Sequence, residues 1–464
     1  MYLKKLNIRN FRCFANYEIE FAPRVTVLFG KNGSGKSTLI HALHKALSFM
    51  MHSEKIKEKD PKTKKWKVVG EQSLRGGNPY VGVEGYSKVG DENYKRTKRA
   101  DYLIEISAKA DLDEMTPIEW AMSVYYIDNR LRTSEYKDAF SRLYNWHKHT
   151  GLRPLLAYYS DGYPHYSNIK KSKKENFKET FLVNSFDESF GYTDWNTEMG
   201  CTNTWLNRLE TKLRTIKNSV LQLAETNNEN VQNLLWDEYK TAEKEVNYVI
   251  DILKQFSKDD PKYAIDIIRN SSFDSCLEII TIDGKIHSFR KLPAGYKRMF
   301  YIALDIAYRC FFLTNGERMN VGGIVIIDEI DLHLHPELEK VILRRFTETF
   351  PNLQFIISTH SPLVLTGLET VDKKNRILRM ETDQSSPEVM FDIYGLDLNS
   401  GMQEVMGINP NDDELNRWIS RCAYMRSKGY QEQADNLMQF IVSKNLLSSK
   451  EIENRIDKAL KNLN

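Results

Sequence analysis

Cysteine is scarce in this chain, and its cysteines lie far apart. The 464 residues contain five of them: Cys13, Cys201, Cys276, Cys310 and Cys422. No Cys-x-x-Cys pair occurs, which excludes the spacing typical of zinc sites and dithiol redox centres. Isolated cysteines are typical of proteins in a reducing compartment, so we expect free thiols rather than disulfides.

Long apolar runs and an excess of one charge are lacking as well. No run reaches the roughly 18 to 20 residues of a membrane span. Residues 1–5 lead into an alternating pattern rather than the apolar stretch of a secretory leader. The 66 Lys and Arg nearly balance the 63 Asp and Glu, so the overall charge does not indicate a nucleic-acid partner. We therefore expect a cytoplasmic protein without a membrane partner.

A glycine-rich loop is the most informative feature that is present. It follows the apolar run 25–29 and fits the pattern GxxxxGK[ST]. Apolar residues at helical spacing come next. A strand, a glycine loop and a helix in this order surround a triphosphate with backbone N–H groups. We therefore expect ATP as cofactor, bound by Gly30, Lys31, Asn32, Gly33, Ser34, Gly35, Lys36, Ser37 and Thr38.

A second motif lies near the other end of the chain. The apolar run 324–327 ends in two carboxylates, Asp328 and Glu329, as expected where Mg²⁺ and a water molecule are held against the triphosphate. Lys36 would then contact the β- and γ-phosphates, while Ser37 and Asp328 would hold Mg²⁺. Glu329 would polarise the attacking water. Simple surface charge at the end of a buried strand is the alternative, which the apolar residues before it disfavour.

Two further segments narrow the class of enzyme. His360 follows the apolar run 355–357, at the strand end where α/β proteins keep ligand sites. A lone histidine would usually be structural, but here it accompanies the other motifs. Gly295 closes the segment Leu-Pro-Ala-Gly, residues 292–295, before an expected long helix. A glycine at a helix start leaves N–H groups and a favourable dipole open to an anion.

In this order the motifs resemble an ABC-type ATPase head of the group that contains the RecF and SMC proteins. The segments that carry the resemblance are Asn-Phe-Arg at 10–12, the loop 30–38, the signature-like 292–295 and the run DEIDLHLHP at 328–336. The last is also similar to a bacterial subfamily shared with OLD-type proteins and phage-defence ATPases. The matching parts cover residues 1–50, 150–162 and 275–366.

The resemblance implies an α/β fold, an ABC-type P-loop head with a central mixed sheet, an inserted helical hairpin and a helical C-terminal tail. It also implies that two heads clamp two ATP molecules, so that catalysis requires at least a homodimer. Arg12 would contact the nucleotide, Gly295 would act on it in trans, and Asp331 would lie at the shared interface. His360 would contact the γ-phosphate and join Glu329 as a catalytic residue.

Two departures from the family pattern bear on turnover. Pro293 and Ala294 stand where the family signature normally has serine, so the trans contact to the γ-phosphate should be weak and hydrolysis slow. No glutamine follows residues 155–159, where the family has its Q-loop, and Ser160 or Asp161 occupies that region. ATP could then act as a conformational switch more than as a fuel.

The chain divides into five stretches by pattern. Residues 1–50 begin the head, residues 51–165 continue it with a basic insertion, and residues 166–261 form a helical insertion. Residues 262–370 complete the head, and residues 371–464 form a mostly helical tail.

Within the helical insertion, apolar residues recur every three or four positions in two runs between 203 and 257, the first including Val220. This spacing predicts an antiparallel helical hairpin, which either packs on the core or forms an oligomer or partner surface. Lysines cluster between 55 and 67 and again between 170 and 178. We expect exposed loops there, and contacts with nucleic-acid phosphates are the alternative.

The start of the tail suggests a context for the ATPase. Residues 394–399, with 404–407 after them, look similar to standalone defence ATPases of the Septu type, including those associated with retrons. These are encoded beside an HNH nuclease, whereas this chain carries neither a Toprim-like acidic cluster nor an HNH-like pattern. We therefore expect an oligomeric ATPase that regulates a separate nuclease through the arrangement of its heads. The alternative is a RecF-like ATPase that binds DNA directly in repair or recombination.

Overall fold

The computed structural model describes residues 1–59, 66–74, 103–125, 134–160, 186–193, 195, 202–271, 276–317, 321–371, 373–381, 384–390, 393–396, 410–444 and 449–461. The chain forms two compact units, residues 1–394 and residues 395–464. Among the described residues, no helix is both long enough and apolar enough to cross a membrane.

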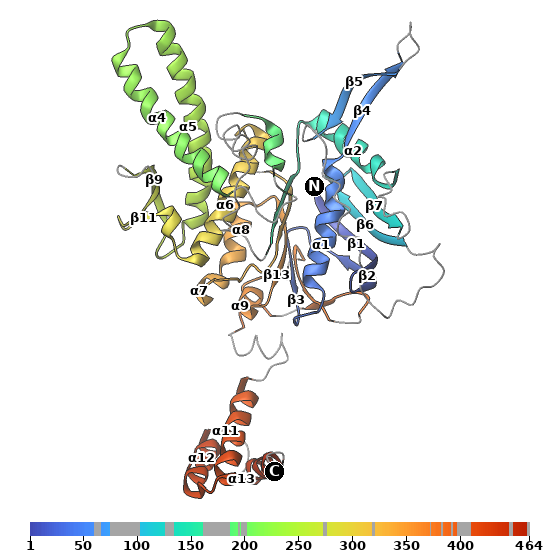
Figure 1. Cartoon of the computed structure of the whole chain (residues 1–464), viewed down its shortest axis with the longest axis vertical. Coiled ribbons are helices and arrows are strands. Elements are labelled where there is room, and N and C mark those ends of the chain that lie inside the picture. The colour runs from blue at the N-terminus through green and yellow to red at the C-terminus, as the bar shows by residue number, and fades with distance from the viewer. Residues whose placement is uncertain are drawn as a thin grey trace. The chain divides into compact units, whose positions relative to one another are not determined.

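The central sheet of the first unit has six strands, of which β3 and β13 are labelled in Figure 1. In order across the sheet they are β15 (Glu388–Met390), β14 (Asn375–Arg379), β3 (Val25–Phe29), β13 (Leu353–Thr359), β12 (Gly323–Ile327) and β8 (Leu155–Tyr159). All neighbours are parallel except β15, which is antiparallel to β14. Every residue of β3, β8, β12 and β13 is buried, as expected for parallel strands covered on both faces. The expected α/β fold with a central mixed sheet is confirmed.

A second, antiparallel sheet lies beside the first. Its order is β2 (Phe14–Glu20), β1 (Tyr2–Phe11), β6 (Leu103–Asp111) and β7 (Pro117–Tyr125). Gln354 of β13 joins the two sheets, because its buried side-chain amide accepts a hydrogen bond from Leu3 N at 2.7 Å. The same amide donates to the carbonyl oxygens of Leu3 and Ala22, both at 2.8 Å. A fully satisfied buried amide of this kind fixes the position of one sheet on the other.

The first lysine-rich segment contains more regular structure than the sequence indicates. β4 (Ser53–Lys59) and β5 (Trp66–Ser73) pair as an antiparallel hairpin where we expected a loop. The pairing gives these backbone groups the hydrogen-bond partners that composition alone cannot reveal. The second lysine cluster, at 170–178, lies outside the described residues.

Helices and a small sheet complete the first unit. The helices near the sheets are α1 (Lys36–Leu47), η1 (Ser48–Met51), α2 (Ser134–Thr150), η2 (Glu188–Tyr192), α6 (Ala294–Thr314), α7 (Pro336–Glu339), α8 (Ile342–Thr349) and α9 (Pro362–Thr366). The small antiparallel sheet consists of β9 (Ile265–Asn270), β10 (Leu277–Thr281) and β11 (Ile286–Ser288), followed by η3 (Phe289–Lys291).

The inserted helical hairpin is confirmed as α4 (Thr202–Glu225) and α5 (Glu229–Ser257), which extend away from the central sheet (Figure 1). Asn228 caps α5 by accepting from the backbone N–H groups of the second and third residues after it. Arg208 and Glu245 form a buried bidentate ion pair between the helices, at 2.5 and 2.8 Å. One residue departs from the expected stripe. Val220 is 51% exposed, and Ser219 beside it is buried instead.

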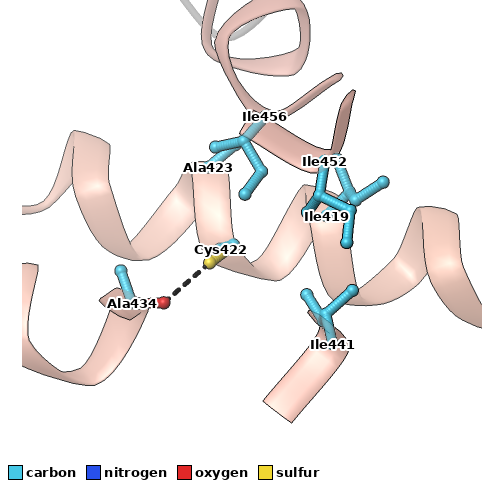
Figure 2. Packing of buried hydrophobic residues seen from close by; sticks show 7 residues of the cluster. All are labelled: Ile419, Cys422, Ala423, Ala434, Ile441, Ile452 and Ile456. Atoms are coloured by element: carbon cyan, nitrogen blue, oxygen red, sulfur yellow. Dashed lines mark hydrogen bonds between the residues drawn. The ribbon is translucent and has the colours of Figure 1, made fainter. Parts of the chain in front are cut away.

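In the part of the second unit that the structure describes, the helices are α11 (Pro410–Ser427), α12 (Gln431–Lys444) and α13 (Ser449–Lys461). Figure 2 shows its buried residues pointing toward one another: Ile419, Cys422, Ala423, Ala434, Ile441, Ile452 and Ile456. The thiol of Cys422 donates to the carbonyl oxygen of Ala434 at 2.9 Å. The unit begins later than the expected tail, because β14 pairs with β3 and thereby joins the region around 375–379 to the first unit.

Asp305 of α6 connects three elements of the first unit. Its carboxylate is fully buried and accepts hydrogen bonds from the Tyr159 hydroxyl at 2.7 Å and from Trp205 Nε1 at 2.5 Å. Arg309 Nε donates to it at 2.6 Å, one turn further along the helix. Tyr159 belongs to β8 and Trp205 to α4. The carboxylate therefore joins the central sheet, the hairpin and α6.

Replacing this carboxylate should destabilise the whole unit. In Asp305→Ala the Arg309 cation loses its buried counter-ion, and we expect the free energy of unfolding to fall by about 3 to 5 kcal/mol. Thermal unfolding followed by circular dichroism measures the change. Glu337→Ala removes a largely exposed carboxylate and serves as the control. Equal melting temperatures for the two variants would contradict the role given to Asp305.

Candidate nucleotide site

Four parallel strands end at one edge of the central sheet, and the predicted site residues follow them. Phe29 pairs with Thr359, so Gly30 and His360 begin side by side. Ile327 pairs with Ile357 and with Tyr159 on its other side. The segments that start at Gly30, His360, Asp328 and Ser160 are therefore brought together. This is the edge at which open α/β sheets bind ligands.

The glycine loop has the backbone conformation that its sequence requires. Gly33 has φ 84° and Gly35 has φ 95°, both in the left-handed region that favours glycine. A Cβ atom at Gly30 would lie 2.2 Å from the carbonyl oxygen of Met380. Gly35 is the N-cap of α1, so the first N–H groups of that helix face the loop.

Lys36 and Ser34 fit a phosphate group in this loop. The buried Lys36 ammonium donates to the carbonyl oxygens of Gly30 at 2.8 Å and Lys31 at 3.1 Å. Burial lowers the pKa of Lys36, while the charges of Asp328, Glu329 and Asp331 raise it and oppose that shift. The buried hydroxyl of Ser34 has no hydrogen-bond partner among the described residues. An anion enclosed by the loop would supply it with an acceptor.

The two carboxylates that follow β12 differ in exposure. Asp328 is 5% exposed, and Ser358 Oγ donates to its Oδ1. The Glu329 side chain is 34% exposed and its Oε1 lies 4.0 Å from Nε2 of His360. Glu329 has φ 50°, a left-handed conformation that non-glycine residues rarely adopt. One carboxylate is thus fixed beside the glycine loop, and the other faces the open side of the site with the histidine.

Asp331 has a local role that its motif does not reveal. Its Oδ1 accepts from the Thr359 hydroxyl at 2.5 Å and from the backbone N–H of His360 at 3.2 Å. The side chain therefore anchors the end of β13 within its own subunit. The expected position at a subunit interface remains a proposal.

Gly295 lies at the start of α6 and packs closely on the same subunit. A Cβ atom there would lie 2.5 Å from the carbonyl oxygen of His333, so only glycine permits this approach. Pro293 and Ala294 before it are exposed. The surface that a second subunit could contact at this point is therefore formed by these two residues.

Arg12 lies in the turn between β1 and β2, with φ 50° and an exposed side chain over the Phe11 ring. The turn touches the glycine loop, because a Cβ atom at Gly35 would lie 2.7 Å from Phe14 Cζ and 3.2 Å from Cys13 Sγ. The turn that contains Arg12 therefore lies beside the loop, and the expected contact of Arg12 with the nucleotide stays a prediction. Asp161, the second candidate for the Q-loop position, lies outside the described residues.

Two residues of the site were missed by the sequence reasoning, Ser358 and Arg298. Ser358 follows a run of apolar residues, and a single serine at that place does not indicate a functional role. Arg298 is buried in α6 and donates to backbone carbonyls at the ends of β8 and β12. For Arg298 there was one signal: it is a cation within a helix that is otherwise almost wholly buried, and a buried cation needs partners.

His44, in the last turn of α1, lies against two aromatic rings. Its ring centroid is 4.7 Å from that of Tyr158 and 4.5 Å from that of Trp195, and its Nε2 lies 3.3 Å from the Trp195 carbonyl oxygen. Since that oxygen can only accept, Nε2 carries a proton and donates. Burial lowers the pKa of His44 to about 4.

The free energy of unfolding should therefore decrease as the pH is lowered from about 6.5 to about 4. Above this window both folded and unfolded chains carry a neutral His44, whereas within it the unfolded chain binds the proton more readily. We expect a loss of about 2 kcal/mol at a pH of about 5, which His44→Gln should largely remove. Denaturant titrations at several pH values measure it. The exposed His149→Gln is the control, and it should keep the wild-type pH dependence.

Comparison with known proteins gives matches over most of the chain. The family model described as AAA ATPase domain matches residues 1–365. The Retron Vc95 probable ATPase of Vibrio cholerae serotype O1 biovar El Tor is 27% identical over 394 residues, which cover 78% of this chain and 71% of that protein. The Septu protein PtuA of Bacillus mycoides (strain KBAB4) is 40% identical over 88 residues, which cover 18% of this chain and 12% of that protein. Among solved structures, the SMC head domain from Thermotoga maritima matches with a TM-score of 0.41 and 13% identity, over 84% of this chain and 100% of that chain.

Proposed function

The chain belongs to the AAA ATPase domain family, and from this premise we propose that it is the oligomeric ATPase subunit of an anti-phage defence complex. The protein is an ATPase with the ABC-type P-loop fold, of the type found with retrons and in Septu systems. The observation that carries the proposal is the meeting of Lys36, Asp328, Glu329 and His360 at one sheet edge.

Each residue of the site has a defined task in the proposed reaction. Lys36 and the N–H groups of the loop hold the β- and γ-phosphates. The hydroxyl of Ser37 and the Asp328 carboxylate hold Mg²⁺, which neutralises charge on the phosphates when bound. Glu329 orients and polarises the attacking water from the open side of the site, and His360 contacts the γ-phosphate.

A second subunit would complete the site. Gly295, Asp331 and Arg12 are the proposed contacts around the nucleotide, the first two across a subunit interface. Because Pro293 and Ala294 offer no hydroxyl to the γ-phosphate, turnover should be slow. ATP occupancy would then set how long the two heads stay together, and this arrangement would regulate a separately encoded HNH-type nuclease.

Direct binding of DNA, in the manner of RecF, is the second candidate. The lysines of the β4–β5 region favour it. Affinity of the isolated protein for DNA that falls steeply with salt would support this candidate over a nuclease regulator.

Substitutions of Lys36 and Glu329 should separate binding from hydrolysis. Lys36→Ala removes the main charge on the phosphates and should abolish ATP binding, whereas Lys340→Ala, an exposed lysine, should not. Glu329→Gln should keep ATP affinity within about twofold and lower turnover by about a hundredfold or more. Fluorescent-nucleotide titration and phosphate release measure the two quantities. Native mass should show Glu329→Gln trapped as an ATP-bound assembly, and wild-type turnover in that variant would refute its catalytic role.

Mixing two inactive variants tests whether the site is shared between subunits. Ala294→Asp places a carboxylate beside the triphosphate of the partner and should abolish turnover, as should Lys36→Ala. In mixed dimers one of the two sites has both an intact lysine and an intact signature. Random exchange should therefore restore about a quarter of wild-type turnover, because half of the dimers are mixed and each has one complete site. No recovery after verified subunit exchange would mean that each site works within one subunit.

A further inference from the structure

The Asp328–Glu329 turn is held by two side chains from other elements. We infer that Ser358 and Arg298 are positioning residues for ATP hydrolysis, which fix this turn so that both carboxylates face the nucleotide. Neither residue is needed to touch the substrate, since each acts through a carboxylate or through the backbone. The inference rests on the roles proposed above for Asp328 and Glu329.

Ser358 bridges the two acidic residues with one hydroxyl. It is fully buried in β13. Its Oγ donates to Asp328 Oδ1 and accepts from the backbone N–H of Glu329 at 2.8 Å. A hydroxyl has one proton and two lone pairs, so it can satisfy both partners at once. The orientation of the first carboxylate is thereby coupled to the backbone of the second.

Arg298 holds the same turn from the opposite element. It is 2% exposed and lies in the first turns of α6. One of its terminal nitrogens, Nη2, donates to the carbonyl oxygens of Asp328 at 2.8 Å, Glu329 at 3.2 Å and Ser160 at 3.3 Å. All three contacts come from one nitrogen at the end of the rigid guanidinium plane. A lysine side chain is one atom shorter and ends in a flexible stem, so its ammonium cannot occupy that position.

These contacts offset the unfavourable conformation of Glu329. Its φ of 50° is one that residues with a Cβ atom adopt only when the surroundings impose it. The hydrogen bonds to Ser358 on one side and to Arg298 on the other impose it here. Without them the backbone at Glu329 should relax, and its carboxylate should leave the position from which it orients water.

The position of Arg298 also links the turn to the signature segment. Gly295 packs on His333, and Arg298 follows one turn later in the same helix. A movement of the start of α6, such as contact with a second subunit would cause, therefore acts on the carbonyl groups of the catalytic turn. The two positioning residues make the geometry of Glu329 depend on that helix.

The first experiment uses Ser358→Ala, which removes a single buried hydroxyl. We expect kcat to fall by about ten- to a hundredfold. ATP affinity measured in EDTA should stay within about twofold, because the loop itself holds the triphosphate. The Mg²⁺ concentration for half-maximal turnover should rise. Amide exchange in a peptide spanning residues 327–331 should become faster, since Glu329 loses the acceptor of its N–H.

Thr26→Val is the matched control, because it removes a fully buried hydroxyl of the neighbouring strand β3 that accepts from the backbone N–H of Ala22. It should lower the melting temperature without changing kcat or exchange at 327–331. Ser358→Thr keeps the hydroxyl and should recover most of the turnover that Ser358→Ala loses.

Arg298→Lys is a second, independent test of the inference. It keeps the charge but not the shared contacts, and should lower kcat more than it changes ATP affinity in EDTA. Arg290→Lys, in the partly exposed pair with Glu210, is its control and should leave kcat unchanged. If either positioning variant slows turnover no more than its control does, or loses ATP affinity by the same factor as kcat, the inference is wrong.

Glu329→Gln, measured in parallel, separates the proposed role of Glu329 from the positioning role of Ser358 and Arg298. If it retains full turnover, the proposed role of Glu329 fails, whatever Ser358→Ala shows.

Discussion

The buried carboxylate of Asp305 is the constraint on which the rest of the first unit depends. It accepts hydrogen bonds from β8, from α4 and from its own helix. A buried charge is tolerated only when its partners stay in place. The sheet edge that forms the nucleotide site and the base of the helical hairpin must therefore keep one relative position. The hairpin is not an appendage that could tilt freely at its base, since Trp205 near the start of α4 is one of those partners.

Helix α6 serves both the hairpin and the catalytic turn. Asp305 and Arg298 are seven residues apart on it, which corresponds to two turns and about 10 Å along the axis. One contacts β8 and α4, and the other contacts the carbonyl groups of Asp328 and Glu329. Since a buried helix moves as a rigid body, a displacement at either end reaches the other. The position of the hairpin and that of the Asp328–Glu329 turn are therefore coupled through α6.

The parts of the site that the sequence predicted are those carried by consecutive residues. The glycine loop, the acidic pair 328–329 and His360 each follow an apolar strand, and the parallel order of those strands brought them together. Ser358 and Arg298 could not be predicted in the same way, because their roles arise from contacts between elements about thirty to one hundred and forty residues apart. The exposed Val220 beside a buried Ser219 was not predicted either. In each case the outcome depends on which neighbour the chain meets, which local pattern does not encode.

The glycine at position 295 can be explained by two different physical requirements. The family resemblance attributes it to contact with ATP in a second subunit. In this structure its lack of a Cβ atom is already required by the carbonyl oxygen of His333 in the same chain. The presence of glycine at this position is therefore no evidence for a shared site, and a substitution there would disturb its own subunit first. Ala294 is exposed, so the effect of its substitution on a partner subunit is the observation that can decide between one-subunit and two-subunit catalysis.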